Sequence, residues 1–204
     1  MQANLVTSPL DEETARAEVY GLLAALFYAA PSAELHTGLG VAVTEAPFPG
    51  ALLEHSWEEL VAAAREFSAA DISLEYDALF GGVGRPEVFL FGSHYLSGFL
   101  NEKPLATLRA DLAELGLARD ETLPETEDHV AYLCEVMRYL IAGDDAEVAN
   151  LTRQREFFTR HVQSWLPGLC GAIAAHPKAR FYASLAAFAA SFVSVEQQGF
   201  DMLV

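Results

Sequence analysis

Residues 8–31 read SPLDEETARAEVYGLLAALFYAAP, and this stretch decides the fold. Ser8 followed by Pro9 is typical of a helix N-terminus, because serine caps free backbone N–H groups and proline fits the first turn. Pro31 cannot continue a helix, so we predict one amphipathic helix that ends before it. Its apolar side chains recur at helical spacing, at Val19, Leu22, Leu23, Leu26 and Phe27.

The same signals recur along the rest of the chain. Capping side chains, apolar residues at helical spacing and glycine or proline at the ends predict further helices. We expect these helices from Ser32 to the glycines at 38–40, from a capping box at Ser56–Glu59, from Asp71 to Gly81, from Pro104 to Leu115, from a capping box at Thr122–Glu125 to Ala142, from Asp144 or Asp145 to about Trp165, and from Lys178 to about Glu196. Residues 45–50 contain two prolines and are expected to form a loop. Residues 88–91 are β-prone but have no partner run nearby. The predicted fold is therefore all-α, a single-domain multi-helix bundle over residues 1–204.

One long irregular loop is expected between the central helices. Residues 81–98 read GGVGRPEVFLFGSHYLSG. Eighteen residues exceed the usual length of a connection, and such loops are commonly functional or packed in an ordered way. The loop and the residue after it carry aromatic side chains that must be buried or offer apolar surface to a ligand: Phe89, Phe91, Tyr95 and Phe99.

Composition limits the class of partner. The chain has 204 residues with 12 basic and 29 acidic side chains, a formal net charge of −17. Binding to nucleic acid or to an anionic membrane needs clustered lysine and arginine, so the charge argues against both. It favours a cationic partner, or none. A hydrophobic content of 52% excludes intrinsic disorder.

Cysteine usage and the N-terminus predict a cytoplasmic protein. Cys134 and Cys170 each lie in an apolar helical pattern, which favours buried thiols in a reducing compartment. Residues 1–13 have neither the basic nor the apolar region of a signal peptide. The most apolar stretch, residues 181–195, is too short to span a bilayer, so we expect no stable membrane insertion.

An acidic cluster surrounds one histidine at residues 125–130, ETEDHV. If this stretch is helical, the spacing of Glu125, Asp128, His129 and Tyr132 places all four on one face. The neighbouring carboxylates then favour the charged form of the histidine. The cluster is explained either by a well-capped helix start or by a polar site that receives a cationic group.

Three motifs resemble those of the TorD/DmsD/NarJ family of redox-enzyme maturation chaperones, which serve molybdoenzymes. Residues 75–81, EYDALFG, look like the helix end of that family. Ser93-His94-Tyr95 is similar to its Ser-x-Tyr loop, and residues 125–130 are similar to its Glu-Pro-x-Asp-His-apolar motif. Thr126 stands where that proline is usual.

The resemblance implies an all-α cytoplasmic chaperone that is not an enzyme and carries no cofactor. Its partner would be a molybdopterin oxidoreductase precursor: the chaperone binds the twin-arginine signal peptide, assists cofactor insertion and delays export. The glycines after Phe80 make both a monomer and a domain-swapped dimer conceivable. The implied client-binding residues are Tyr76, Leu79, Phe80, Ser93, Tyr95, Glu125, Asp128 and His129.

The residues suggest a division of labour within this set. We expect Asp128 and Glu125 to meet the arginines, so that Asp128→Asn weakens binding, while Phe80, Leu79 and Tyr95 line an apolar part. His129 either contacts the peptide or braces the 93–95 loop against its helix.

Two other classes of protein stay open. One is a metal- or nucleotide-dependent hydrolase that uses Glu125, Asp128 and His129. Against it, residues 81–86 lack the lysine of a phosphate loop. None of the six histidines has a carboxylate three residues earlier, as a di-iron bundle requires. The other class is a structural helical adaptor without a peptide groove.

Overall fold

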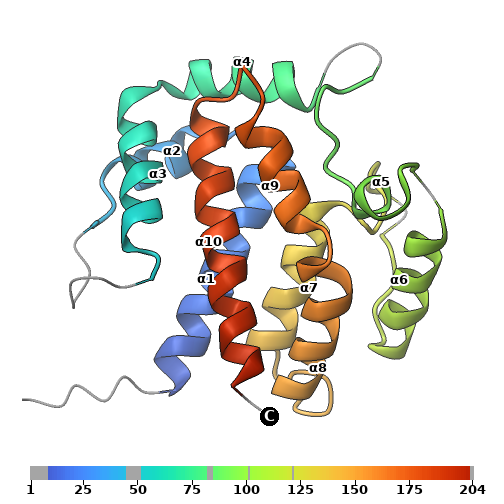
Figure 1. Cartoon of the computed structure of the whole chain (residues 1–204). Coiled ribbons are helices and arrows are strands. Elements are labelled where there is room, and N and C mark those ends of the chain that lie inside the picture. Colours follow the sequence, from blue (N-terminus) through green and yellow to red (C-terminus); the bar gives the residue numbers. More distant parts are fainter. Residues whose placement is uncertain (1–8, 45–51, 82–84, 101, 121, 203–204) are drawn as a thin grey trace, which may run out of the picture.

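The computed structural model describes residues 9–44, 52–81, 85–100, 102–120 and 122–202. Over these residues the chain folds into a helix bundle without a β-strand (Figure 1). The elements are α1 (Pro9–Tyr28), α2 (Ala33–Gly40), α3 (Glu54–Glu66), α4 (Ala69–Leu79), α5 (Gly92–Ser97), α6 (Lys103–Glu114), α7 (Val130–Ala142), α8 (Leu151–Phe157), the π-helical segment η1 (Phe158–Gln163), α9 (Leu166–Ala174) and α10 (Phe181–Asp201). The predicted all-α fold class is confirmed.

One hydrophobic core holds these helices together. α1 lies along α7, and α10 packs against both α9 and α3. The apolar stripe predicted for the first helix faces the core, where Leu23, Leu26 and Phe27 have no exposed surface. α10 adds Phe181 and Tyr182, which are also fully buried. Because this core joins residues from α1 to α10, the described residues form the expected single-domain bundle. The limits at residues 1 and 204 stay a prediction.

Helix limits that depend on neighbouring residues in the sequence are confirmed. α1 ends at Tyr28, before Pro31. Ser32 caps α2, because its Oγ accepts a hydrogen bond from the Leu35 N–H at 3.1 Å. α6 is followed by Gly116 with a φ of 73°, a left-handed conformation that glycine adopts without strain.

Two predicted helix starts are wrong by a few residues. α3 begins at Glu54, so Ser56 lies inside the helix, where its hydroxyl donates to the Leu53 carbonyl at 3.2 Å. α4 is capped by Ser68 and not by Asp71. Asp71 instead accepts the Ser68 N–H at 3.1 Å, which completes a capping box.

The predicted starts of the two later helices are wrong by more. Asn150 caps α8, not Asp144 or Asp145, and the helix changes to π-helical form after Phe157. α7 begins at Val130 and not at Glu125. The backbone of the preceding segment pairs with another part of the chain: the Gly92 N–H donates to the Asp128 carbonyl and the Val130 N–H to the Leu90 carbonyl. This pairing occupies groups that a helix from 125 would need.

The long central loop is less irregular than expected. Residues 85–91 are irregular, but α5 follows at once (Figure 1). Ser8, the loop predicted at 45–50 and the glycine at 82 lie outside the described residues. The thiols of Cys134 and Cys170 are buried and free, as predicted, and burial raises the pKa of both. Within the described ranges, none of the helices has the length and apolar character needed to cross a membrane.

Candidate functional site

The first and third motifs lie where α1 ends, and the second motif is bonded to the third. The Tyr76 hydroxyl donates to the Tyr28 carbonyl at 2.7 Å, which attaches the first motif to the last residue of α1. The Val88 N–H donates to the Leu79 carbonyl at 2.9 Å, and the Leu90 carbonyl accepts from Val130 at 2.8 Å. A continuous set of backbone contacts therefore links α4, the 88–92 segment and the start of α7.

The first motif supplies one core residue and two aromatic rings. Leu79 is fully buried, so it packs the bundle and does not reach a surface. Phe80 is half-buried, with its ring 5.1 Å from Tyr182 and 5.2 Å from Tyr76. Burial, followed by the nearby carboxylates of Glu125 and Asp77, raises the pKa of Tyr76 to about 12.

Glu75 in the same motif has a role that sequence reasoning missed. Its carboxylate accepts the backbone N–H groups of Arg180 and Tyr182 at 2.8 Å and of Phe181 at 3.1 Å. α10 has no capping side chain at its own N-cap position. Glu75, which lies in α4, therefore caps the start of α10. Its negative charge there is also stabilised by the positive end of the α10 dipole.

The second motif lies against α9 and its preceding turn. The Tyr95 hydroxyl donates to the Phe89 carbonyl at 2.9 Å, and its ring stacks on Trp165 at 5.6 Å. A Cβ on Gly92 would lie 3.0 Å from the Trp165 indole, so only glycine fits there without movement. The Ser93 side chain is buried, and its hydroxyl has no hydrogen-bond partner among the described residues.

Apolar surface is exposed just beyond this motif. Phe99 is 70% exposed, and Leu96 and Leu100 are also exposed. Phe89 is half-buried, stacked on His94 at 4.3 Å with the Arg85 guanidinium 5.1 Å from its ring centre. Of the four aromatic residues singled out in the loop region, Phe99 therefore offers the most open surface to a ligand.

Asp128 of the third motif is a buried internal brace. Its carboxylate accepts the Ser93 N–H at 2.9 Å and the Thr126 hydroxyl at 2.6 Å. Its carbonyl accepts the Gly92 N–H at 2.9 Å. Thr126, which replaces the family's usual proline, thus supplies a donor to the carboxylate. With both carboxylate oxygens bonded internally, Asp128 fixes the start of α5 against the start of α7.

His129 is buried and neutral. Its Nδ1 accepts the Ala131 N–H at 3.2 Å as the N-cap of α7, and its ring centre lies 5.1 Å from that of Phe91. Burial lowers its pKa to about 4, although the Asp128 carboxylate acts in the opposite direction. The expectation of a charged His129 is therefore wrong, because desolvation outweighs the nearby charge.

A neutral buried histidine makes stability depend on pH. An unfolded histidine has a pKa near 6.5, so acid favours the unfolded chain. The His129 contribution is complete above that pH and is lost as the pH falls from 6.5 towards 4. Between pH 7 and pH 5.5 we expect wild type to lose about 1 kcal/mol more unfolding free energy than His129→Asn, which keeps a capping side chain. Urea unfolding at both pH values measures the difference. Equal losses in the two proteins would mean that His129 titrates normally.

Glu125 is placed differently from the other acids of its segment. Glu127 is paired with Arg109 of α6 through two hydrogen bonds of 2.9 Å. Glu125 is half-buried and makes no hydrogen bond or ion pair within the described part of the chain. Its charge acts on Tyr76 and on Tyr132. Burial first, then the neighbouring Tyr28 and after it Glu125, raise the pKa of Tyr132 to about 12.

Tyrosine rings and two carboxylates therefore share one surface. Tyr28 is 42% exposed, with its ring centre 5.9 Å from that of Tyr132. Asp77 is exposed and, like Glu125, makes no hydrogen bond or ion pair with the described residues. We call Tyr28, Tyr76, Asp77, Glu125 and Tyr132 the tyrosine–acid surface. Sequence reasoning missed Tyr28 and Asp77, since only the meeting of α1 and α4 brings them to this place.

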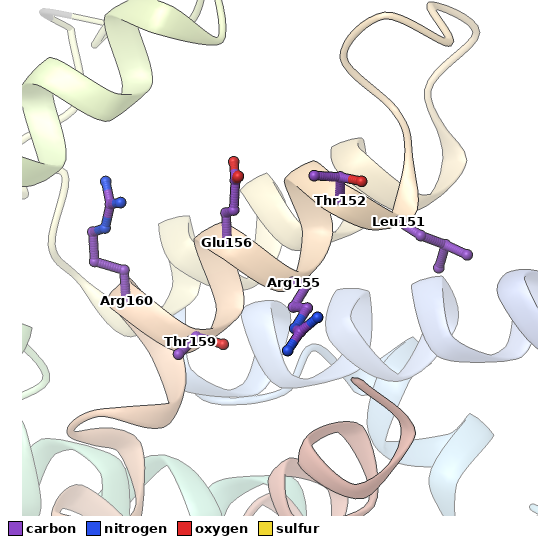
Figure 2. A pocket seen from close by; sticks show the side chains of 6 residues that line it. All are labelled: Leu151, Thr152, Arg155, Glu156, Thr159 and Arg160. Atoms are coloured by element: carbon purple, nitrogen blue, oxygen red, sulfur yellow. The ribbon is translucent and has the colours of Figure 1, made fainter. Parts of the chain in front are cut away.

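A hollow elsewhere on the molecule does not bring its charged side chains together in this way. It measures about 710 Å³ and follows α8 and η1 (Figure 2). Figure 2 shows Arg155 projecting away from Glu156 and Arg160. Arg160 is also paired with Asp111 at 2.7 Å. The charged side chains here do not point to a common ligand position.

The acidic segment does not form a metal-ligand set in the described ranges. No group of three or more histidine, cysteine, aspartate or glutamate side chains there could hold a metal ion. Asp128 and His129, which the hydrolase alternative requires, are engaged in internal hydrogen bonds.

Comparisons with known proteins agree with the motifs. Residues 50–171, more than half of the chain, match the family described as nitrate reductase delta subunit. A chaperone protein TorD from Vibrio cholerae serotype O1 is 25% identical over 210 residues, which cover 93% of each chain. A chaperone protein TorD from Vibrio parahaemolyticus is 25% identical over 140 residues, 65% of each chain. The resemblance seen in the sequence is confirmed, and the chain belongs to the nitrate reductase delta subunit family, which includes the TorD and NarJ type of protein.

Proposed function

We propose that this protein is a cytoplasmic maturation chaperone for a molybdopterin oxidoreductase, and that it binds the client's twin-arginine signal peptide at the tyrosine–acid surface. It holds the apo-enzyme during cofactor insertion, delays export until insertion is complete, and is not itself an enzyme. Membership of the family and the chaperone names of the Vibrio relatives support this role. The net charge of −17 also suits a basic peptide partner.

The proposal is carried by two carboxylates, Glu125 and Asp77, which lie near the Tyr76 ring and make no hydrogen bond or ion pair with the described residues. An arginine guanidinium forms hydrogen bonds with carboxylates and stacks on aromatic faces, and Tyr28 offers such a face. Asp128, with both oxygens already bonded, holds Ser93 at the start of α5 and Thr126, and does not meet the arginines.

The apolar part of the peptide needs a second region close by. α5 starts beside Asp128, and the exposed side chains of Leu96, Phe99 and Leu100 follow along and beyond it. We place the apolar stretch of the signal peptide against these three side chains. Tyr95 and Phe80, which are half-buried, then support the surface, and Leu79 acts only through the core.

Calorimetry with a synthetic twin-arginine peptide tests this assignment. We expect Glu125→Gln combined with Asp77→Asn to weaken binding by about tenfold or more, because charge-assisted hydrogen bonds to arginine are lost. Binding should also weaken with added salt. Glu135→Gln is the matched control, since it removes an exposed acid on α7 whose ion-pair partner in the described part of the chain is Arg138. Equal affinity in wild type and the double variant would contradict the assignment.

A further inference from the structure

A second surface lies apart from the tyrosine–acid surface, between the N-terminal half of α1 and the C-terminal half of α10. It is a groove of about 590 Å³, within the usual range for ligand pockets. The two helix segments stand at the lower end of the bundle in Figure 1. Most of its lining is apolar: Val19, Leu52, Leu53, Leu151, Phe192, Val195, Phe200 and Met202.

The polar side chains at the floor of the groove already have hydrogen-bond partners. Arg16 binds the Glu196 carboxylate with two hydrogen bonds, at 2.7 and 2.9 Å. The Tyr20 hydroxyl donates to the same carboxylate at 3.0 Å, and the Tyr20 ring meets Phe192 edge-on at 4.9 Å. These contacts join α1 to α10 and neutralise the only basic side chain that lines the groove in the described part of the chain.

Apolar and acidic side chains line the rim of the groove and are accessible to a partner. Leu52 is 71% exposed and Met202 is 80% exposed. Glu12 and Glu13 line the same groove and make no hydrogen bond or ion pair with the described residues. An open apolar surface with a polar rim commonly marks an interaction site. The rim is therefore complementary to an apolar segment that carries a positive charge beside it.

A second copy of this chain does not supply that complement. Related by a twofold axis, two copies would bring Glu12 and Glu13 near their own counterparts. Each copy also carries a net charge of −17. The occupant must instead bring lysine or arginine next to its apolar side chains.

We propose that this groove binds a helical segment of the client protein with an apolar face flanked by lysine or arginine. The inference rests on the proposed function only in naming the client as the partner. From Arg16 to Tyr28 there are twelve residues of α1, about 18 Å at 1.5 Å per residue, so the groove and the tyrosine–acid surface are separate. The chaperone thus has one surface for the signal peptide and another for a second client segment.

The probe is a synthetic amphipathic helix of about 15 residues with a leucine face and lysines elsewhere. Fluorescence anisotropy compares its binding to the full chain with that of a scrambled peptide of the same composition. The test variant combines Leu52→Glu with Met202→Glu. Leu74→Glu is the matched control, since Leu74 is 70% exposed on α4 and is not part of the groove.

We expect the groove variant to bind the probe about tenfold more weakly than wild type. Weaker binding is diagnostic, because the two added glutamates would strengthen the binding of a lysine-rich probe if the attraction were only electrostatic. Leu74→Glu should bind as wild type does. Unchanged binding in the groove variant, or equal binding of the scrambled peptide, overturns the inference. So does a wild-type dimer in sedimentation that Leu52→Glu disrupts, since a second copy would then occupy the groove.

The twin-arginine peptide separates this inference from the proposed function. The groove variant should bind that peptide as wild type does. If the peptide fails to bind any protein while the leucine–lysine probe depends on the groove, the proposed function fails and the groove stands. If the groove variant also loses the twin-arginine peptide, the two surfaces are not separate and the inference is overturned.

Discussion

Replacing Arg16 by methionine is expected to lower the free energy of unfolding by about 3–5 kcal/mol, because it leaves the Glu196 carboxylate buried without its cation. Only 4% of the Glu196 side chain is exposed. Arg16 also donates to Gln154 at 3.1 Å, and Gln154 donates to the Leu140 carbonyl at 3.0 Å. The network thus connects α1, α7, α8 and α10. Urea unfolding followed by circular dichroism measures the loss.

The double variant Arg16→Met with Glu196→Leu is the control for this interpretation. Without the carboxylate no charge is left buried, so the pair should be more stable than Arg16→Met alone. Recovery should be incomplete, because the Tyr20 hydroxyl loses its acceptor. A loss in Arg16→Met below about 1 kcal/mol would show that the ion pair contributes no more than an exposed one.

Asp128→Ala is expected to lower the free energy of unfolding by about 3 kcal/mol, since it removes two hydrogen bonds to a buried carboxylate. The Ser93 N–H is then left without its acceptor. Amide hydrogen exchange at Ser93 should become faster, and unfolding in urea gives the energy. Asp128 therefore acts by fixing the position of α5, and it affects peptide binding only indirectly.

Asp120→Ala is a matched control for that variant. Asp120 accepts a backbone N–H at 2.9 Å and a threonine hydroxyl at 2.6 Å, both from Thr122, but it is exposed. The hydrogen bonds are the same in kind as those of Asp128, and only the burial differs. We expect Asp120→Ala to be much less destabilising. Equal losses at the two positions would contradict the description of Asp128 as a buried brace.

Much of the fold was predictable because its signals are local. The apolar spacing of α1, the serine before α2 and the proline and glycine around α6 each act within one or two turns. Helix starts were less predictable. A serine or threonine three residues before a glutamate also occurs at Ser56 and Thr122, where the side chains bond to Leu53 and Asp120 instead.

The candidate site was predictable only in part. The motifs indicated which segments matter, and the structure brings the first and third to the end of α1 and bonds the second to the third. The state of each side chain depended on tertiary contacts that no local pattern shows. Burial among rings makes His129 neutral, pairing with the 90–93 segment occupies Asp128, and contact with α10 turns Glu75 into a cap.

Hydrogen–deuterium exchange of the full chain, with and without a twin-arginine peptide, shows directly whether the peptide binds at the tyrosine–acid surface. We expect slower exchange at the end of α1, over residues 76–80 and 96–100, and over 125–132. We expect no change in the C-terminal half of α10. Absence of binding would instead favour a structural adaptor, and protection confined to helices away from the tyrosine–acid surface would contradict the assigned site.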